Sequence, residues 1–310
     1  MTSLICGSLA YDSIMQFGGR FSEALLADQL HKINVAFLVP EMRREFGGCA
    51  GNIAYNLKLL NGDPLIMATI GNDGGSYLER LDRLQITRRC VRTIDTSYTA
   101  QAFITTDVNG NQITAFHPGA MTFSHENKVA DAGPVKLAIV APDGRDGMLQ
   151  HAVDCVDLDI PFIFDPGQGL PMFNGSELVH FIELATYVAV NDYEAELLTG
   201  RTELSLDQVA RRVSALIVTR GDKGAEIFAN GQRYEIPCVT AEAVVDPTGC
   251  GDAFRAGLMY GITQGMDWET TGRLASLMGS IKIAQQGGQN HAPSRQEIED
   301  RFHKAFGYRF

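Results

Sequence analysis

Short apolar runs recur along the chain, and stretches of helical spacing separate them. Because polar residues do not alternate within these runs, both faces of each predicted strand should be buried, as in a parallel sheet covered by helices. The alternation of strands with helices predicts an α/β fold with a mainly parallel central sheet between helical layers. The predicted strands are residues 4–8, 65–71, 137–142, 162–166, 187–191 and 215–221.

Helical spacing is clearest in three segments. Asn52 opens a helix that Gly62 ends, and Asp252 opens a second one whose apolar residues lie on one face. A third, longer helix is predicted over 268–284. Asn and Asp are common N-cap residues, so both polar side chains are expected at helix starts.

Two further patterns extend this fold. Residues 224–237 contain two strand-like runs around an Asn-Gly pair, which predicts an antiparallel hairpin at the edge of the sheet. Residues 12–45 and 96–120 alternate polar and apolar positions, and the turn at 108–111 suggests another hairpin. We expect these two segments to form a small β-sheet lid over the open end of the main sheet, where it would exclude water from a transfer reaction.

The length of 310 residues allows one large domain with an appended element, or two domains. We take residues 1–310 as one domain into which the lid segments are inserted. With 45% hydrophobic residues and no evident signal peptide or membrane-spanning run, the prediction is a cytoplasmic protein with no membrane partner. The net charge of −11 disfavours a nucleic-acid partner, which would need a basic surface.

Several common functional motifs do not occur in the sequence. The turn after the first strand lacks G-x-G-x-x-G, and G-x-x-x-x-G-K-[ST] is absent, so a Rossmann dinucleotide site and a Walker P-loop are unsupported. G-x-S-x-G and H-E-x-x-H are missing too. The six cysteines lack zinc-ligand spacing, and reduced thiols are expected.

The turn at 249–252 is the best candidate for an anion site. Gly249 and Gly251 allow a close approach of the main chain, so that the N–H groups of this turn, including that of Cys250, can converge on one phosphate at a helix N-terminus. Asp252 can accept a proton from an attacking hydroxyl. The alternatives are a helix merely capped by Asp252, and a nucleophilic Cys250, for which no partner base is identifiable.

A second glycine pair, Gly47 and Gly48, shortly precedes Asn52. The glycines would permit close backbone approach, and the Asn52 amide can bind a hydroxyl-rich ligand or simply cap its helix. Asp12 follows the first strand, at the sheet end where ligands bind in open parallel sheets. Its carboxylate can accept from two adjacent ribose hydroxyls or cap a loop.

Four motifs, in their order and spacing, resemble those of the ribokinase-like, or PfkB, carbohydrate and nucleoside kinases over nearly the whole chain. They are FGGCAGNIA at 46–54, VNDYE at 190–194, VTRGDKG at 218–224 and DPTGCGDAF at 246–254. The resemblance implies a ribokinase-like three-layer α/β/α fold and an ATP-dependent phosphotransferase. It also implies that Asp252 is the catalytic base and that 249–251 form the anion hole.

Other roles come from the resemblance alone. Asn191 and Glu194 match the family's N-x-x-E motif, associated with magnesium and phosphate positioning. Thr219 and Gly221 match its T-x-G nucleotide-binding motif. The positions that hold the sugar hydroxyls are those of Asp12, Gly48 and Asn52.

Within the family, the lid segments and the DPTGCGDAFRAG stretch look most like bacterial adenosine kinases. This likeness implies that Phe116 stacks on the purine, that Ser8 lines the substrate site and that Gln168 lies nearby. Residue type alone favours Phe116 as a core or hinge aromatic. The likeness also implies a homodimer through the lid and stimulation by potassium. One departure from the family pattern, Pro247-Thr248, concerns the monovalent-cation site.

The predicted function is adenosine kinase, with ATP- and Mg²⁺-dependent transfer of the γ-phosphoryl group to the 5′-hydroxyl of adenosine, giving AMP and ADP. The alternatives are a family member acting on ribose, a phosphosugar, inosine or guanosine, and a non-catalytic ligand-sensing protein of the same fold. No catalytic role is predicted for His117 or Arg255. Arg255 could assist a phosphate or face solvent on its helix.

Overall fold

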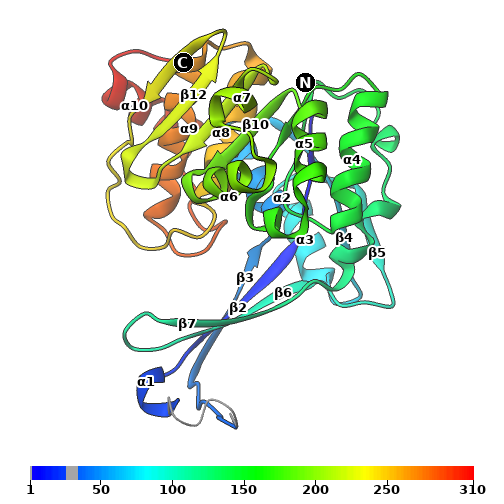
Figure 1. Cartoon of the computed structure of the whole chain (residues 1–310). Coiled ribbons are helices and arrows are strands. Elements are labelled where there is room, and N and C mark those ends of the chain that lie inside the picture. Colours follow the sequence, from blue (N-terminus) through cyan, green and yellow to red (C-terminus); the bar gives the residue numbers. More distant parts are fainter. Residues whose placement is uncertain (1, 26–33) are drawn as a thin grey trace.

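The computed structural model describes residues 2–25 and 34–310, and in these ranges the strands form two separate sheets (Figure 1). The larger sheet has the strand order β13-β12-β11-β10-β9-β8-β1-β4-β5. Its strands are β1 Thr2–Cys6, β4 Asp63–Gly71, β5 Thr87–Ile94, β8 Leu137–Val140, β9 Phe162–Phe164, β10 Tyr187–Asn191, β11 Ala215–Thr219, β12 Ala225–Ala229 and β13 Gln232–Ile236.

The predicted mainly parallel sheet is confirmed. β1 lies between β4 and β8 and is parallel to both, while β12 and β13 form the predicted antiparallel hairpin beside β11. The edge strand β5 was not predicted, because its sequence, TRRCVRTI, contains too many polar residues to form an apolar run. An edge strand is partly solvated, so it does not need one.

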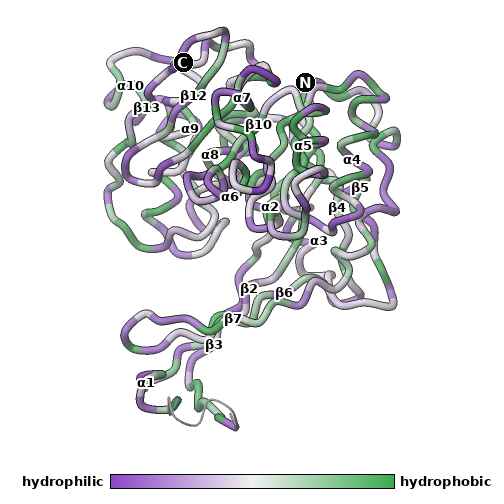
Figure 2. The backbone as a smooth tube through the Cα atoms, viewed as in Figure 1, coloured by the Kyte–Doolittle hydropathy of each residue, from purple (hydrophilic) through white to green (hydrophobic). Residues whose placement is uncertain are grey.

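Helices cover both faces of this sheet, which gives the three layers expected. Side chains of each central strand alternate between the faces; Leu4 packs into one helical layer and Ile5 into the other. Figure 2 shows hydrophobic residues running through the middle of this body, with many hydrophilic residues in the peripheral loops. On the Ile5 face lie α2 Cys49–Leu59, α3 Gly75–Arg83, α8 Cys250–Gln264 and α9 Trp268–Ile283. On the Leu4 face lie α4 Arg145–Asp157, α5 Gly175–Leu184, α6 Asp192–Thr202 and α7 Leu206–Ala210.

The remaining helical elements are peripheral to the sheet. α10 packs against α9 in a third apolar cluster. Across residues 2–25 and 34–310, none of the helices is both long and apolar enough to cross a bilayer. The peripheral helical elements are α1 Phe21–Ala24, α10 Arg295–Phe306, and the 3₁₀ segments η2 Gly119–Glu126, η3 Val129–Ala132, η4 Gly167–Met172 and η5 Gly221–Lys223.

Two predicted helix starts are too late, that of α2 by three residues and that of α8 by two. α2 begins at Cys49 and α8 at Cys250, each after a glycine with positive φ, +84° at Gly48 and +78° at Gly249. Asn52 and Asp252 therefore lie inside the first turn and do not cap their helices. Glycine can adopt this backbone conformation at little cost, which explains a start that no Asn or Asp cap marks. The long helix α9 agrees with its predicted bounds.

The smaller sheet projects from one end of the body as an elongated ribbon (Figure 1). We call it the lid sheet. Its strand order is β3-β2-β6-β7, and the β7 side chains are exposed along the whole strand. Its strands fall largely within the predicted lid segments 12–45 and 96–120. Residues 26–33 of the first segment lie outside the described residues. That this sheet acts as a lid inserted into a single domain stays a prediction. The strands are β2 Ala10–Gln16, β3 Glu41–Gly47, β6 Ala100–Thr106 and β7 Gln112–His117.

Candidate active site

A cavity of about 690 Å³ lies where the carboxyl ends of the parallel strands meet the lid sheet. The strand order reverses direction between β1 and β8, and such switch points are where open α/β sheets bind ligands. Of the predicted site residues, Cys250 and Gly221 are not part of the wall. The structure brings the others together around it: Ser8, Asp12, Gly48, Asn52, Phe116, Gln168, Asn191, Glu194, Thr219, Gly249, Gly251 and Asp252.

Asp252 presents its carboxylate to the cavity from the first turn of α8. Asn52 donates to its Oδ2 at 2.8 Å. Burial raises the pKa of Asp252 to about 6, the nearby charge of Asp165 adds to this effect, and the Asn52 hydrogen bond opposes it. A carboxylate with this pKa is ionised at neutral pH and is a stronger base than an exposed aspartate, as general-base catalysis requires.

A hydrogen bond from Gln289 fixes the orientation of the Asn52 amide. Gln289 donates through Nε2 to Asn52 Oδ1 at 3.1 Å and to the Tyr77 hydroxyl at 2.9 Å, while Arg80 holds Gln289 Oε1 at 3.1 Å. Since Asn52 Oδ1 accepts from Gln289, its Nδ2 is the atom that faces Asp252. Sequence reasoning missed Gln289, because it lies 237 residues from Asn52 and in no motif.

The glycine turn before α8 differs in part from the predicted anion hole. The N–H of Cys250 donates to the Pro247 carbonyl oxygen at 3.1 Å, so this amide has a main-chain partner, and its place in the anion hole stays a prediction. A Cβ added at Gly251 would meet nothing within 4 Å, so protein packing does not require glycine at this position. Gly251 lines the cavity. Burial raises the pKa of the Cys250 thiol to about 11, which argues against a nucleophilic role.

Close packing explains the other glycine pair. A Cβ at Gly48 would lie 2.5 Å from the Ser8 carbonyl oxygen, and one at Gly47 would lie 2.5 Å from Asp12 Oδ2. Ser8 also accepts the Cys49 N–H through Oγ at 3.3 Å. These contacts bring the start of α2 against the β1–β2 connection and place Ser8 and Asp12 at the cavity.

Asp12 is a second carboxylate with a raised pKa. Burial raises its pKa to about 6, and the charges of Asp246 and Glu45 add to the effect. Asp12 lies on β2 at the root of the lid sheet, so it belongs to the wall that would face a sugar if the base site is at Asp252. Its contacts agree with the predicted location, and its role remains a prediction.

The lid sheet contributes mostly apolar groups to the cavity. Phe116 on β7 lines the wall and is 48% exposed, so the interpretation as a core aromatic is wrong. Ala102 and Ile104 on β6 lie beside it on the same face, as alternate residues of a strand must. His117, the next residue after Phe116, is exposed on β7 and is not part of the wall.

Asn191 and Glu194 form a capping box at the start of α6. The Glu194 N–H donates to Asn191 Oδ1 at 2.7 Å, and the Asn191 N–H donates to Glu194 Oε2 at 2.8 Å. Burial raises the pKa of Glu194. In the described part of the chain no cluster of three His, Cys, Asp or Glu is placed to hold a metal ion. Mg²⁺ needs no such cage, because one or two carboxylates with substrate phosphates suffice, and Glu194 and Asp165 line the cavity.

Of the two named residues of the T-x-G motif, Thr219 lines the cavity and Gly221 does not. Thr219 ends β11 and lines the wall, with its Oγ1 3.5 Å from the Val190 carbonyl oxygen. Gly221 begins η5 at φ +55°, outside the lining. Its main-chain conformation accounts for glycine without a ligand.

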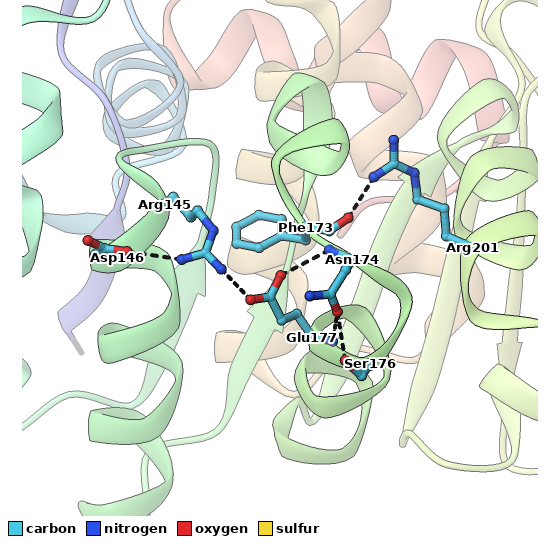
Figure 3. Close-up of polar contacts among 7 residues, drawn as sticks. All are labelled: Arg145, Asp146, Phe173, Asn174, Ser176, Glu177 and Arg201. Atoms are coloured by element: carbon cyan, nitrogen blue, oxygen red, sulfur yellow. Dashed lines mark hydrogen bonds and ion pairs between the residues drawn. The ribbon is translucent and has the colours of Figure 1, made fainter.

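Gln168 lies in the wall on η4. Figure 3 shows the polar contacts around Phe173 and Asn174, which directly follow η4. Arg201 donates to the carbonyl oxygen of Phe173 at 2.6 Å. Asn174 and Glu177 form a capping box at the start of α5, and Arg145 from α4 pairs with Glu177. The segment that carries Gln168 is thus tied to three helices.

Sequence reasoning missed two polar residues of the wall, Asp143 and Asp165, and left the place of Arg255 open. Arg255 is buried, in contrast to the solvent-facing alternative, and its Nη2 pairs with Asp165 Oδ1 at 3.1 Å in the cavity wall. Burial raises the pKa of Asp143, which lines the same wall, to about 8, so this carboxyl is mainly neutral at pH 7. An Asp after each of two apolar strands was the available signal for Asp143 and Asp165.

The cavity holds a buried carboxylate at a helix N-terminus, a glycine turn next to it and a buried arginine, and phosphoryl transfer to a hydroxyl uses groups of these kinds. The fold and the cavity therefore define the class of α/β phosphotransferases. Comparison with known proteins gives the family. The family model described as pfkB family carbohydrate kinase matches residues 10–295, and the chain belongs to this family. The predictions of a ribokinase-like fold and of an ATP-dependent phosphotransferase are confirmed.

Individual relatives support the same conclusion. A nucleoside kinase of Methanocaldococcus jannaschii is 30% identical over 273 residues, which cover 87% of this chain and 90% of that protein. The structure of Burkholderia thailandensis nucleoside kinase in complex with inosine superposes with a TM-score of 0.92 at 58% identity, covering 99% of this chain and 100% of the other. The same enzyme in complex with ADP-inosine gives a TM-score of 0.88 at 60% identity, covering 99% and 97%.

Proposed function

We propose that the protein is a nucleoside kinase that transfers the γ-phosphoryl group of ATP to the 5′-hydroxyl of a purine nucleoside, with adenosine as the predicted acceptor. The observation that carries the proposal is the position of Asp252. Its carboxylate, with a pKa raised to about 6, lies in one cavity with the glycine turn and with Phe116 of the lid sheet. The Asp252 carboxylate and the glycine turn serve the phosphoryl transfer. The aromatic ring of Phe116 suits stacking on the flat purine base of the nucleoside.

In the proposed reaction, Asp252 takes the proton of the 5′-hydroxyl while the hydroxyl oxygen forms a bond to the γ-phosphorus of ATP. The bond from that phosphorus to the bridging oxygen breaks, and ADP leaves. The N–H groups at Gly249 and Gly251 and the Arg255 guanidinium stabilise the charge on the transferred group. The carboxylate of Asp12 accepts from ribose hydroxyls.

Magnesium belongs to the proposal as the ion that neutralises charge on the ATP phosphates. Glu194 and Asp165 are the carboxylates available to it in the wall. Asn191, Thr219 and the 218–224 segment are assigned to the nucleotide, by resemblance. Closure of the lid sheet would exclude water, which could otherwise compete as the acceptor.

Inosine is the strongest alternative acceptor, because the Burkholderia thailandensis enzyme was solved with it. Ribose is less well suited to the cavity, since a bare sugar would leave Phe116 without a stacking partner. A ligand sensor without catalysis would not require the raised pKa of a base beside the anion turn.

The test is a panel of acceptors with labelled ATP, comprising adenosine, inosine, guanosine and ribose, run with and without potassium. We expect turnover of purine nucleosides, with adenosine among them, and a 5′-monophosphate as the product. Turnover of ribose with none of the nucleosides would contradict the proposal. If inosine is phosphorylated and adenosine is not, the protein is still a nucleoside kinase, but adenosine is not its acceptor.

Assembly and location complete the proposal. We infer a cytoplasmic homodimer that associates through the lid sheet, where Met42, Phe103 and Ile113 expose apolar surface. Burying such surface is favourable in water. Sedimentation velocity should show a dimer that becomes monomeric when Phe103 and Ile113 are replaced by serine, and a parent that stays monomeric at all concentrations would contradict this part.

A further inference from the structure

Lys282, in the last turn of α9, is fully buried, with 0% of its surface exposed. Its Nζ donates to the carbonyl oxygens of Asp246 at 2.7 Å and of Gln285 at 3.0 Å. Both partners are main-chain atoms. A lysine ammonium is rarely buried in this way, because removal from water is costly unless its hydrogen bonds are replaced.

Burial lowers the pKa of Lys282, and the charges of Cys250 and Asp246 oppose this effect. The C-terminal end of a helix carries partial negative charge, and Lys282 lies in the last turn of one. Its charge is also felt at Cys250 in the glycine turn, where it opposes the rise in the pKa of the thiol. Lys282 is therefore a buried cation next to the proposed anion site.

Lys282 connects the two segments that shape the glycine turn. Residues 245 and 246 donate their N–H groups to the Ile283 carbonyl oxygen at 2.9 and 3.1 Å. The Asp246 carboxylate accepts the N–H groups of Thr248 at 2.9 Å and Gly287 at 2.8 Å. A Cβ built on Gly249 would lie 3.2 Å from Gly288 Cα, so the 285–289 segment packs directly against the turn.

We propose that the Lys282 ammonium is a built-in cation that fixes the anion-binding turn and replaces a monovalent metal ion there. Main-chain carbonyl oxygens are ligands for potassium as well as for an ammonium group. Lys282 is thus a positioning residue for the transfer, and the parent enzyme does not need potassium. This inference rests on the proposed function and opposes the potassium stimulation that the family resemblance implies.

The first experiment uses the parent protein. Its kcat with adenosine or inosine, in choline chloride and in potassium chloride of equal ionic strength, should agree within about twofold. A parent that is active only with potassium would overturn the inference and leave the proposed function intact. A parent without nucleoside kinase activity in either salt would instead contradict the proposed function.

The second experiment removes the ammonium with Lys282→Met. We expect kcat to fall by about 10²-fold in choline chloride, with the nucleoside KM changed by less than about threefold. Potassium should restore much of kcat and should raise the Tm of this variant more than that of the parent, because the freed carbonyl oxygens can bind it. Tm is a readout independent of catalysis.

Two further variants complete the design. Lys136→Met is the matched control, since Lys136 also donates to a carbonyl oxygen, that of Thr263, but is exposed. It should show neither loss nor rescue. If Lys282→Met does not fold, Lys282→Gln retains donors without the charge. Full activity of either Lys282 variant without potassium, or a loss that potassium leaves unchanged in kcat and Tm, would overturn the inference.

Discussion

The larger sheet and the lid sheet form opposite walls of one cavity, yet they differ in how they are held. We call the wall made by the larger sheet and α8 the floor. Central floor strands such as β8 are buried at every residue, whereas β7 of the lid sheet is exposed at every residue. A side chain attached to the floor is fixed by packing on both faces. The outer strand β7 of the lid sheet has no such packing on its side chains.

This difference suggests a division of work. Asp252 and Arg255 project from α8 in the floor, where their positions and charges are set by buried partners. Phe116 and Ile104 project from the lid sheet, where they can adjust to what is bound. We expect floor substitutions to reduce kcat and lid substitutions to raise KM for the nucleoside.

The largest effect is expected for Asp252→Asn. Without a base, kcat should fall by about 10²–10⁴-fold while the nucleoside still binds. Asp192→Asn is the matched control, because Asp192 is also an acid in the first turn of a helix but is exposed. Steady-state kinetics with adenosine measures both. Equal rates for Asp252→Asn and the parent would show that Asp252 is not the base.

The next effect is that of Gly251→Ala, which separates function from stability on the floor. The added methyl group meets no protein atom within 4 Å, so the free energy of unfolding should stay the same or rise by up to about 1 kcal/mol. Activity should fall by about 10²–10³-fold if this amide approaches the transferred phosphate.

Gly75→Ala is the control for that substitution, since Gly75 is also a first-turn glycine with open space around its Cβ. It should alter neither activity nor stability appreciably. Urea unfolding together with kinetics gives the comparison. A Gly251→Ala enzyme with parental activity would mean that the phosphate binds elsewhere.

A smaller effect is expected on the lid side, for Phe116→Ala. Loss of a stacking partner should raise the nucleoside KM about tenfold with little change in stability, since the side chain is already 48% exposed. Phe103→Ala is a close control, because Phe103 lies in the same sheet at 43% exposure but is not part of the cavity wall. Equal KM values for the two variants would contradict the assigned role of Phe116.

The mildest test is the pH dependence of kcat/KM. In the proposed roles Asp252 and Asp12 must both be ionised, and their pKa values are raised to about 6, so activity should fall as the pH drops below about 6. Two ionisations give a limb of slope two, and Asp12→Asn should reduce the slope to one. A flat profile through this range would show that neither carboxylate has to be ionised.

The floor could be predicted from sequence because its strands are continuous apolar runs, such as 187–191, and its motifs are local. Helix starts after Gly48 and Gly249 were missed, since the caps are glycines in positive φ and not Asn or Asp. β5 was missed because an edge strand can be polar.

The supporting contacts of the site could not be read from the sequence at all. Asn52 reaches Asp252 across 200 residues, and Arg255 reaches Asp165 across 90. Such pairs follow from the strand order, which brings distant segments to one edge of the sheet. The buried state of Lys282 depends likewise on where α9 ends.

The most direct test of the division between floor and lid is a comparison of kcat and KM for Asp252→Asn and Phe116→Ala with the same nucleoside. We predict that Asp252→Asn lowers kcat at least about 10²-fold with the nucleoside dissociation constant unchanged, and that Phe116→Ala raises KM about tenfold with kcat retained. Parental kcat in Asp252→Asn, or a loss of kcat at constant KM in Phe116→Ala, would contradict the account.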